Sequence, residues 1–464
     1  VGMNLSLEGI GAELNSPDGY CTIRKLHPGP AARSKQIKEG DRIVGVAQGD
    51  GPFVDVVDMN LNKVVQLIRG PKGTEVRLSI IPADAPDPSV RKTVRLIRDK
   101  ISLEEQAAKA KVLDLTGPDG EPLRIGVLDL PTFYSTMDIT GTEDRADNKS
   151  SATDVARLLR KLNEEKVQGL VLDLRRNGGG SLEEAIRITG FFIKKGPVVQ
   201  VRDSDGHVTV KEDRDPRVLY DGPLVVLTSR FSASASEIVA AALQDYGRAI
   251  VVGDASTHGK GTVQTPSLLR AFMRPSTVVT NDPGLLKYTI SKFYRANGES
   301  TQLRGVEPDI VLPSVLNYST DIGESSLENP LPWDTIESAR FERLDRTDPY
   351  KEELRQRSAE RVATGTDFDY VREDIEHFKK TQADKSISLN EQQRLQEKAE
   401  AKARQKAREK ERLARTPSEI TVYELMLKNV DQPGLPPPVA RTNNLAAVDA
   451  KSSSDTTVDA AEIA

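Results

Sequence analysis

The chain has 464 residues, a formal net charge of −5 and one cysteine, Cys21. Its length predicts about three domains of roughly 150 residues each. The nearly balanced charge argues against a nucleic-acid-binding surface over the whole chain. Without an apolar run of about 18 residues, the sequence predicts no membrane span. A single cysteine excludes an intramolecular disulfide and a cysteine-based zinc site, and the four scattered histidines form no HExxH pair, so we expect no metal site.

A small β-rich module is predicted over residues 1–82, with strands over 20–26 and 74–81 and a helix over 60–68. Its turns and elements come in the order GIGA, PGPA, GDRIVGV and a helix that ends in GPKGTEV. In this order they resemble a PDZ domain.

The turn Gly9-Ile10-Gly11 is the candidate binding element of this module. Glycine-permitted backbone can aim successive N–H groups inward and form a nest for a carboxylate, and the neighbouring sheet edge can accept an added strand. Two glycines around one apolar residue are also common in an ordinary hairpin or bulge. The resemblance to PDZ domains implies the binding role, in which the backbone near these three residues captures a free C-terminal carboxylate.

A linker is predicted over residues 83–105, where prolines break the order, with one strand over 91–98 that pairs back. Residues 106–320 then alternate apolar strands with helices. The continuous apolar run 169–174 is typical of a parallel strand buried on both faces, and residues 224–252 repeat the strand-helix-strand unit. The pattern predicts an α/β core that binds its ligand at the carboxyl ends of the strands.

The character of the chain changes after residue 320. Residues 321–430 are highly charged and predicted to form a helical C-terminal domain. Within it, 392–415 is almost purely Glu, Lys, Arg, Gln and Ala, which favours a solvated helix with i,i+4 ion pairs. A nucleic-acid or membrane surface is disfavoured because no aromatic residues interleave with the charges. Residues 431–464, first Pro-rich and then rich in Ala, Ser and Asp, are predicted to be a disordered tail.

Ser234 stands where an apolar strand turns into a helix, and two interpretations compete. With Glu237 three residues later it has the pattern of a capping box. The same position exposes a serine hydroxyl beside the orphan N–H groups and the positive end of a helix. These groups stabilise a developing oxyanion, and the N–H of Ala235 is the natural donor. On the second interpretation Ser234 is a nucleophile.

The next loop holds two candidates for the base that such a serine needs, His258 and Lys260. His258 requires an orienting acid, for which Asp245 is a candidate. Lys260 lies between two glycines, so the backbone can pass close to another segment and bury the amine, which lowers the pKa of a lysine. Gln264, four residues on, can hold the amine through its side-chain oxygen.

The glycine turn Gly178-Gly179-Gly180 ends another buried strand. Three glycines are usual in a tight turn before a helix. They also allow the backbone to approach a reacting carbonyl closely, so the turn is a candidate second oxyanion donor. A dinucleotide site is not predicted because the GxGxxG pattern is absent.

Four segments together resemble the tail-specific proteases, or C-terminal processing peptidases: DLRRNGGGSL at 173–182, RFSASASEIVAAALQDYGRA at 230–249, GKGTVQ at 259–264 and GVEPDIVLP at 305–313. The resemblance implies an α/β catalytic core of the ClpP/crotonase type behind a PDZ domain. The helical C-terminal part is similar to that of the longer periplasmic bacterial branch, which implies a periplasmic protein. No signal peptide is present, and the chain opens directly in a strand-like pattern, so we expect its natural start to lie upstream.

The resemblance also implies a role for each candidate residue. Ser234 is the nucleophile, Lys260 the general base and Gln264 the group that orients the lysine. Gly179 and Ala235 donate the oxyanion-hole N–H groups, and another glycine of the same turn can replace Gly179. The implied protein is a serine endopeptidase that needs no cofactor and selects protein substrates with apolar C-terminal tails through its PDZ domain. A lipoprotein adaptor is a further implied partner.

Two rival hypotheses remain from the sequence. One is a catalytically inactive PDZ scaffold or chaperone, and the other is a Ser-His-Asp hydrolase that uses His258. The loop GDASTHGK is one residue longer than the G-E-x-T-F-G-K of the family and has His258 at an apolar position. The structure therefore has to show how the loop of Lys260 is placed relative to Ser234.

Overall fold

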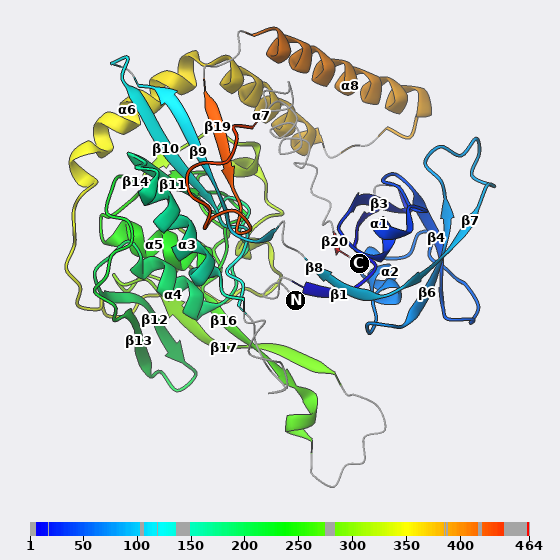
Figure 1. Cartoon of the computed structure of the whole chain (residues 1–464), viewed down its shortest axis with the longest axis horizontal. Coiled ribbons are helices and arrows are strands. Elements are labelled where there is room, and N and C mark those ends of the chain that lie inside the picture. Colours follow the sequence, from blue (N-terminus) through cyan, green and yellow to red (C-terminus); the bar gives the residue numbers. More distant parts are fainter. Residues whose placement is uncertain are drawn as a thin grey trace. The chain divides into compact units, whose positions relative to one another are not determined.

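The computed structural model describes residues 6–16, 18–102, 106–117, 119–135, 149–273, 284–384, 386, 388–415, 420–439 and 462–463. They fall into two compact units, which lie within Asn4–Gln106 together with Arg441–Ala464 and within Ala107–Ala440. Figure 1 shows the elements of both units with their labels.

The smaller unit has two helices and two sheets. One sheet has the strand order β20-β2-β3-β4-β6-β7, with β5 paired to β4, and the other consists of β1 and β8. The strands are β1 (Ser6–Gly9), β2 (Ala12–Asn15), β3 (Cys21–Leu26), β4 (Arg42–Gln48), β5 (Val54–Asp55), β6 (Glu75–Ile81), β7 (Lys92–Ile97), β8 (Asp99–Ser102) and β20 (Glu462–Ile463), and the helices are α1 (Pro30–Ser34) and α2 (Leu61–Ile68). The predicted strands over 20–26 and 74–81 and the predicted helix over 60–68 are confirmed.

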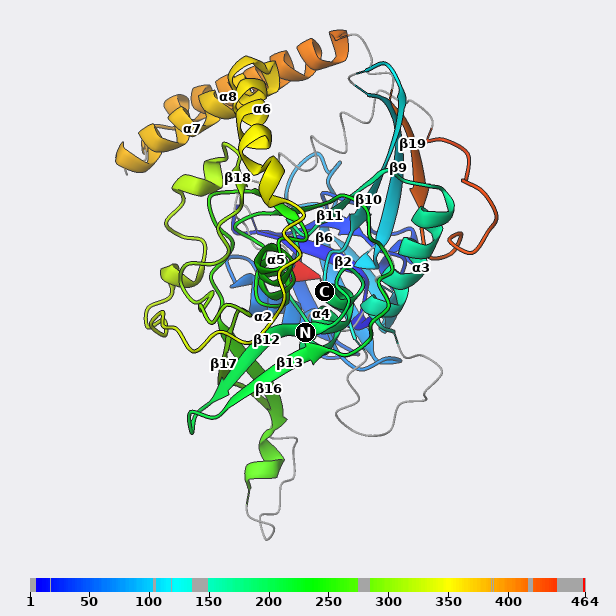
Figure 2. The ribbon, with the colours of Figure 1, turned by 90° about the vertical axis from the view of Figure 1, so that its left-hand side faces the viewer.

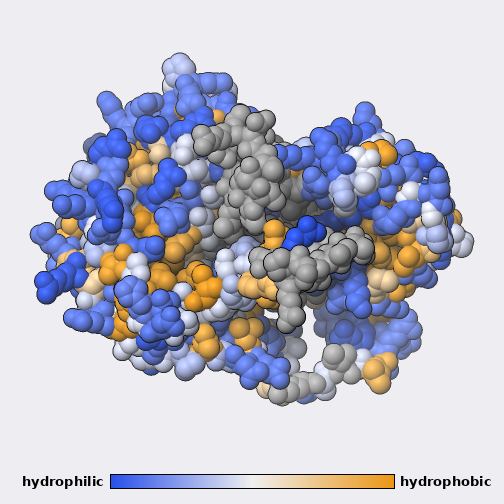
Figure 3. Space-filling model, turned by 90° about the horizontal axis from the view of Figure 1, so that it is seen from below, coloured by the Kyte–Doolittle hydropathy of each residue, from blue (hydrophilic) through white to orange (hydrophobic). Residues whose placement is uncertain are grey.

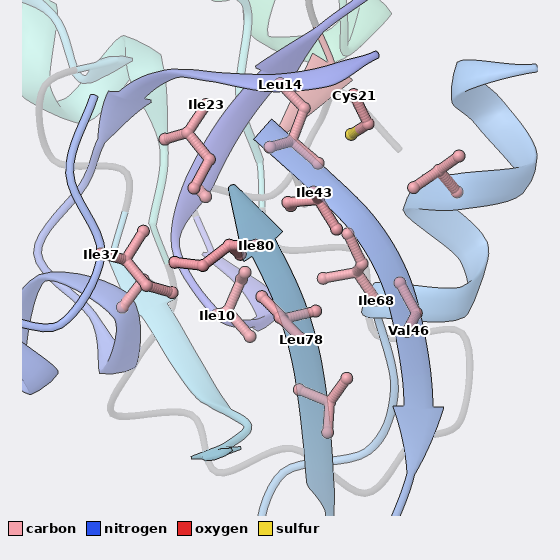
Figure 4. Close-up of a cluster of buried hydrophobic side chains, with 14 of the residues drawn as sticks. Ile10, Leu14, Cys21, Ile23, Ile37, Ile43, Val46, Ile68, Leu78 and Ile80 are labelled. Atoms are coloured by element: carbon pink, nitrogen blue, oxygen red, sulfur yellow. The ribbon is translucent and has the colours of Figure 1, made fainter. Parts of the chain in front are cut away.

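Aliphatic side chains of these elements form the core of the smaller unit. Helix α2 begins after Asn60, whose side chain accepts a hydrogen bond from Asn62 N–H, and it buries one face that includes Ile68. Figure 4 shows Ile68 beside Ile43 of β4 and near Leu78 of β6. Residues that alternate along a strand reach the same face of the sheet, which explains why every second residue of β6 is buried.

The stretch 83–105, expected as a linker, contains two strands. β7 pairs antiparallel with β6, as expected for 91–98, and β8 pairs antiparallel with β1. Val94 and Leu96 alternate along β7 and join the core of the smaller unit. Their burial explains the difference from the expectation, because these residues complete one domain before the chain passes on to the next.

The larger unit contains two sheets, with strand orders β18-β15-β14-β11-β10-β9-β19 and β13-β12-β17-β16. The first consists of β9 (Lys109–Thr116), β10 (Pro122–Asp129), β11 (Gly169–Asp173), β14 (Leu224–Thr228), β15 (Ile250–Gly253), β18 (Ile310–Val311) and β19 (Thr421–Leu425). The second consists of β12 (Gly196–Asp203), β13 (Val208–Asp213), β16 (Thr262–Leu268) and β17 (Leu285–Tyr294).

The centre of the first sheet is parallel, with β11 paired to β10 and to β14, and β14 paired to β15. Three helices pack against one another over it: α3 (Ser151–Glu164), α4 (Leu182–Gly190) and α5 (Ala235–Asp245). The predicted α/β core is therefore confirmed. Because β11 and β14 are parallel neighbours, the turns that follow them emerge at the same edge of the sheet, which brings the glycine turn next to the SASAS turn.

The predicted helical region contributes a strand that the sequence did not reveal. β19 pairs antiparallel with β9 at the edge of the first sheet, and Leu425 is fully buried. Residues 431–439, expected to be disordered, are also held to the core, since Lys161 Nζ donates to Gln432 O at 3.0 Å and Val439 N donates to Val422 O at 2.8 Å. Residues 440–461 and 464 of the predicted tail lie outside the described residues.

The remaining helices are α6 (Lys351–Thr364), α7 (Thr366–Asp384) and α8 (Glu391–Ala414). No residue of α8 is buried, as expected for a solvated helix, and the helix pairs with α7 through charges (Figure 2). Arg408 bonds Glu373 and Asp374, each at 2.8 Å. Over the described part of the chain, no helix is both long and apolar enough to cross a lipid bilayer. On the face in Figure 3, apolar residues lie scattered among hydrophilic ones.

Candidate active site

Ser234 lies at the turn between β14 and α5, where it is the N-cap of the helix. Its backbone has φ 55° and ψ −111°, a left-handed conformation that L-residues other than glycine rarely adopt. Ser234 is half-buried, whereas the helix behind it is almost completely buried. A strained backbone at a strand-to-helix turn presents the hydroxyl at the edge of the sheet.

Ser234 differs in its environment from the two neighbouring serines of the SASAS run, Ser232 and Ser236. Ser232 Oγ donates to Leu174 O at 2.8 Å and Ser236 Oγ donates to Asn177 O at 2.6 Å, and both residues are fully buried. These two hydroxyls hold the turn of Ser234 to the segment that leads into the glycine turn. Ser234 alone among the three is open to solvent.

Lys260 is half-buried in the loop between β15 and β16, and its Nζ donates to Gln264 Oε1 at 3.0 Å. The predicted lysine–glutamine contact is therefore present. Burial lowers the pKa of the Lys260 ammonium, and so does the nearby cation of Lys287, while the carboxylates of Glu324 and Glu237 oppose the shift. A lowered pKa increases the share of neutral amine, which is the form that can accept a proton.

The two glycines beside Lys260 are needed for space. A Cβ on Gly259, which has φ 90°, would lie 2.9 Å from the backbone carbon of Leu303, and one on Gly261 would lie 2.7 Å from the backbone nitrogen of Gln302. Leu303 N also donates to Gly259 O at 2.7 Å. The lysine loop thus runs directly against the segment 301–303, as the sequence predicted from its glycines.

The carboxylate of Glu237 joins the turn of Ser234 to the loop that carries Lys260. Its Oε2 accepts from Ser234 N–H at 2.7 Å and from Lys260 N–H at 3.0 Å. Its Oε1 accepts from Thr257 Oγ1 at 2.6 Å and from Gly259 N–H at 2.7 Å. Complete burial raises the pKa of Glu237 to about 7, while the four donors favour the ionised form. The capping-box partner recognised in the sequence therefore has a second task that the sequence did not reveal.

The glycine turn packs directly against Ser234. Gly179 has φ 107°, and a Cβ placed there would lie 2.9 Å from both Ser234 Cβ and Ala233 O. Its own N–H donates to Asn177 Oδ1 at 2.9 Å, and its carbonyl accepts from Phe133 N–H at 2.9 Å. Asn177, a buried residue that the sequence analysis did not single out, therefore fixes this turn from inside.

A Ser-His-Asp constellation is not assembled from the predicted residues. Asp245 lies at the far end of α5, where Arg295 Nη2 bonds its Oδ1 at 2.5 Å and Asn297 Nδ2 bonds it at 3.2 Å. The acid beside His258 is instead Glu324, with 3.8 Å between Nδ1 and Oε2. Burial lowers the pKa of His258. Asp245 therefore cannot orient His258.

In the described part of the chain, no hydrogen bond joins Ser234 Oγ to Lys260 Nζ. Catalytic hydrogen bonds are often long in a free enzyme and tighten when the substrate binds. The structure brings Ser234, Gly179 and Ala235 together at one turn and ties the backbone of Lys260 to the same turn through Glu237.

In the smaller unit, Gly9 ends β1, and Ile10 and Gly11 connect it to β2, with Gly11 at φ 79°. Ile10 O accepts from Ala31 N–H at 2.9 Å, which fixes the connection to α1. The edge of β2 next to it pairs antiparallel with β20 of the same chain, and β20 also contacts α2. The edge beside the predicted carboxylate nest can thus accept an added strand.

An α/β core with a strained serine at a strand-to-helix turn, a lysine loop tied to that turn and a PDZ-type module in the same chain is the architecture of a PDZ-bearing serine peptidase. Comparison with protein families agrees. Residues 124–312 match "Peptidase family S41", residues 1–81 match "PDZ domain" and residues 318–456 match "C-terminal domain of tail specific protease". The chain belongs to peptidase family S41, among the tail-specific proteases.

Individual relatives are similar over most of the chain. The tail-specific protease of Haemophilus influenzae is 41% identical over 392 residues, which cover 84% of this chain and 52% of that protein. The carboxy-terminal-processing protease of Bartonella bacilliformis is 34% identical over 332 residues, which cover 69% and 65%. The PDZ domain of a carboxy-terminal protease from Vibrio cholerae, solved in complex with a peptide, is 52% identical, with 21% of this chain and 100% of that one covered at a TM-score of 0.21. The chain spans about half the length of the Haemophilus relative.

Proposed function

We propose that this chain is the recognition and catalytic part of a serine endopeptidase that selects proteins by their C-terminal tail and hydrolyses them with a Ser234–Lys260 dyad. The observation that carries the proposal is the Glu237 carboxylate, which bonds the backbone N–H of both dyad residues. One buried side chain thereby holds a strained serine and a lysine of lowered pKa in a fixed relation, as a nucleophile and its base require.

The dyad carries out acyl transfer in two steps. Ser234 Oγ attacks the carbonyl carbon of the scissile bond while the neutral Lys260 amine takes the hydroxyl proton. The tetrahedral oxyanion accepts hydrogen bonds from Ala235 N–H, at the start of α5, and from an N–H of the glycine turn. The Gly179 N–H, which donates to Asn177 Oδ1 in this structure, turns to the oxyanion as its acceptor during the reaction. Lys260 then protonates the leaving amine and the C–N bond breaks. In the second step the neutral lysine deprotonates a water that attacks the acyl carbon, and the lysine returns this proton to Ser234 Oγ as the ester C–O bond breaks.

Gln264 has an orienting role in this scheme. Its side-chain oxygen accepts from Lys260 Nζ, and an oxygen acceptor leaves the lone pair of a neutral amine free to point elsewhere. Because Gln264 lies on β16, next to the loop that carries the lysine, it holds the amine on the active-site side of that loop.

The PDZ domain is proposed to capture the substrate's C-terminus. The backbone of Gly9, Ile10 and Gly11 forms the carboxylate nest, and the substrate tail pairs as a strand with the edge of β2, where β20 pairs in this structure. The substrates are proteins with apolar tails, no cofactor takes part, and the location is periplasmic, with a lipoprotein adaptor as a further partner. The relative from Vibrio cholerae, whose PDZ domain was solved with a peptide, supports the peptide-binding role.

The test is cleavage of an unfolded protein with an apolar C-terminus by the purified full chain and its variants. Ser234→Ala is expected to lower kcat about 10⁴-fold or more without changing the melting temperature. Ser236→Ala is the matched control, because its hydroxyl is committed to Asn177 O, and it is expected to change stability more than chemistry. Retained cleavage by Ser234→Ala would overturn the dyad, and an inactive wild-type chain that still binds tail peptides would favour the scaffold.

A second pair of variants separates the two candidate bases. Lys260→Ala is expected to remove activity, whereas His258→Ala is expected to retain most of it, since His258 faces Glu324. The opposite result would assign the base to His258.

A further inference from the structure

A short segment after the peptidase core, residues 322–324, is buried against both loops of the active site. Ile322 O accepts from Nη2 of Arg230 at 2.6 Å, and Arg230 belongs to the turn that leads to Ser234. Glu324 N–H donates to the carbonyl of His258 at 2.9 Å, in the loop that leads to Lys260. The segment therefore bridges the nucleophile turn and the lysine loop on a second side, independently of Glu237.

Gly323, between these two contacts, has no room for a side chain. Its φ is 109°, and a Cβ would lie 2.7 Å from Arg230 Nη2 and 3.0 Å from His258 O. This close approach shows that the segment packs directly against both loops.

The Glu324 side chain continues this contact toward the lysine. It is 7% exposed, and its Oε1 accepts from Gln302 Nε2 at 3.1 Å. Oε1 of the same glutamine, which is fully buried, accepts from Gly261 N–H at 2.8 Å. One amide group thus links the Glu324 carboxylate to the residue that follows Lys260, while Oε2 lies 3.8 Å from His258 Nδ1 on the preceding side.

Charged groups surround the Lys260 amine from several elements. Lys287 on β17 disfavours its ammonium form, whereas Glu237 on α5 and Glu324 favour it. Nδ1 of His258, in the same loop, lies 3.8 Å from Glu324 Oε2, and the nearby cation of Arg230 helps to lower the pKa of His258. Among the carboxylates acting on the lysine, Glu324 is the one contributed from outside the residues that match the peptidase family, since it falls within the match to the C-terminal domain.

We propose that Glu324 is a positioning residue of the active site, through which the C-terminal domain sets both the place and the charge of Lys260. Through Gln302 and His258 it fixes the backbone on either side of the lysine. Its negative charge favours the ammonium form of Lys260 and thereby opposes the effect of burial. The C-terminal domain is in this way a part of the catalytic machinery, and a peptidase core without the segment 322–324 lacks one support of its base.

This inference rests on the proposed dyad, and two substitutions in the full chain test it. Glu324→Gln keeps a side chain that can accept from Gln302 but removes the charge. The acid limb of kcat/KM against pH is expected to move to lower pH, because the ammonium form of Lys260 loses a stabilising carboxylate. Glu324→Ala also removes the contact, and kcat is expected to fall about 10- to 100-fold with little change in KM.

Two controls make the result specific. Glu328→Gln removes a charge from an exposed position four residues on and is expected to leave the profile unchanged. Lys287→Gln removes the cation that opposes Glu324 and is expected to move the acid limb the other way, to higher pH. A purely structural role for Glu324 would lower stability or kcat but would not give shifts of opposite sign.

A direct titration keeps the inference separate from the proposed function. NMR of the reductively ¹³C-methylated Lys260 amine reports its titration midpoint whether or not the chain cleaves a substrate. A lower midpoint in Glu324→Gln than in the wild type supports the inference. An unchanged midpoint together with an unchanged profile would overturn it, and an inactive wild type with a shifted midpoint would count against the proposed function alone.

Discussion

The two ends of α5 each hold a buried carboxylate, and the two differ in their partners. At the start of the helix, Glu237 bonds four N–H and O–H donors from two loops and no cation. At its end, Asp245 forms an ion pair with Arg295, the residue that follows β17. The first arrangement fixes the relation between two loops, while the second joins the helix to the neighbouring sheet.

This difference indicates which of the two acids, Glu237 or Asp245, supports catalysis. A carboxyl group held only by neutral donors, as Glu237 is, positions the backbone of the reacting residues. The charge of a carboxylate paired with arginine is compensated, and removing one partner of such a buried pair destabilises the fold. The contacts of Asp245, with Arg295 and Asn297, lie away from the turn of Ser234. We therefore expect substitutions at the two ends of α5 to separate catalysis from folding.

Outside the dyad itself, the largest effect on catalysis is expected for Glu237→Gln. The amide replaces one acceptor by a donor, so two of the four donors face an NH₂ group, and each unpaired buried group costs about 1–3 kcal/mol. A shift of the lysine loop relative to Ser234 follows, and kcat is expected to fall about 100-fold. Steady-state kinetics at neutral pH measures the change. Near-normal kcat would show that Glu237 is only a helix cap.

Gly179→Ala is expected to be the next most severe change. Its Cβ would lie 2.9 Å from Ala233 O and from Ser234 Cβ, at a φ of 107°. The strain costs about 1–3 kcal/mol, and displacement of Ser234 is expected to lower kcat at least tenfold. Gly178→Ala is the matched control, because nothing lies within 4 Å of the added Cβ. Equal losses in the two variants would contradict a special role for Gly179.

Asp245→Asn is expected to affect the other end of the helix alone. Arg295 is then left without a charged partner, and the free energy of unfolding is expected to fall by about 2 kcal/mol, as for loss of a hydrogen bond to a charged group. Urea unfolding measures this change, while kcat is expected to stay within about twofold of the wild type. A loss of kcat in a fully folded variant would show that Asp245 contributes to catalysis.

The smallest expected effect is on the pH dependence of stability. The pKa of Glu237 is raised from 4.5 to about 7, so between these values the folded protein holds a proton that the unfolded chain has lost. The wild-type free energy of unfolding should therefore decrease relative to that of Glu237→Gln as pH rises from 4.5 to about 7, and level off above. Urea unfolding at pH 5 and pH 8 compares the two, and a difference of opposite sign would indicate that the four donors outweigh burial.

The sequence by itself determined the elements and the chemical residues. Apolar runs such as 169–174 predicted parallel strands, because a strand covered by helices on both faces needs no polar side. Glycines beside Lys260 predicted a close backbone approach, and the spacing of Lys260 and Gln264 predicted their contact. These predictions succeeded because each depends on residues that are near in the chain.

Only the tertiary structure decided the relations between distant segments. The strand β19 was missed because it is a short segment beyond the charged helices, and its burial depends on the edge of β9, which lies some 300 residues earlier. The sequence singled out Ser234 by its place at the start of a helix and by the family resemblance, whereas only the structure shows that the hydroxyls of Ser232 and Ser236 are committed to carbonyls near the glycine turn. The contacts of Glu237 with the lysine loop, and of Glu324 with Gln302, likewise join residues that no local pattern connects. The local sequence pattern therefore predicts the chemical role of a residue, whereas the partners of a buried carboxylate depend on how distant segments pack.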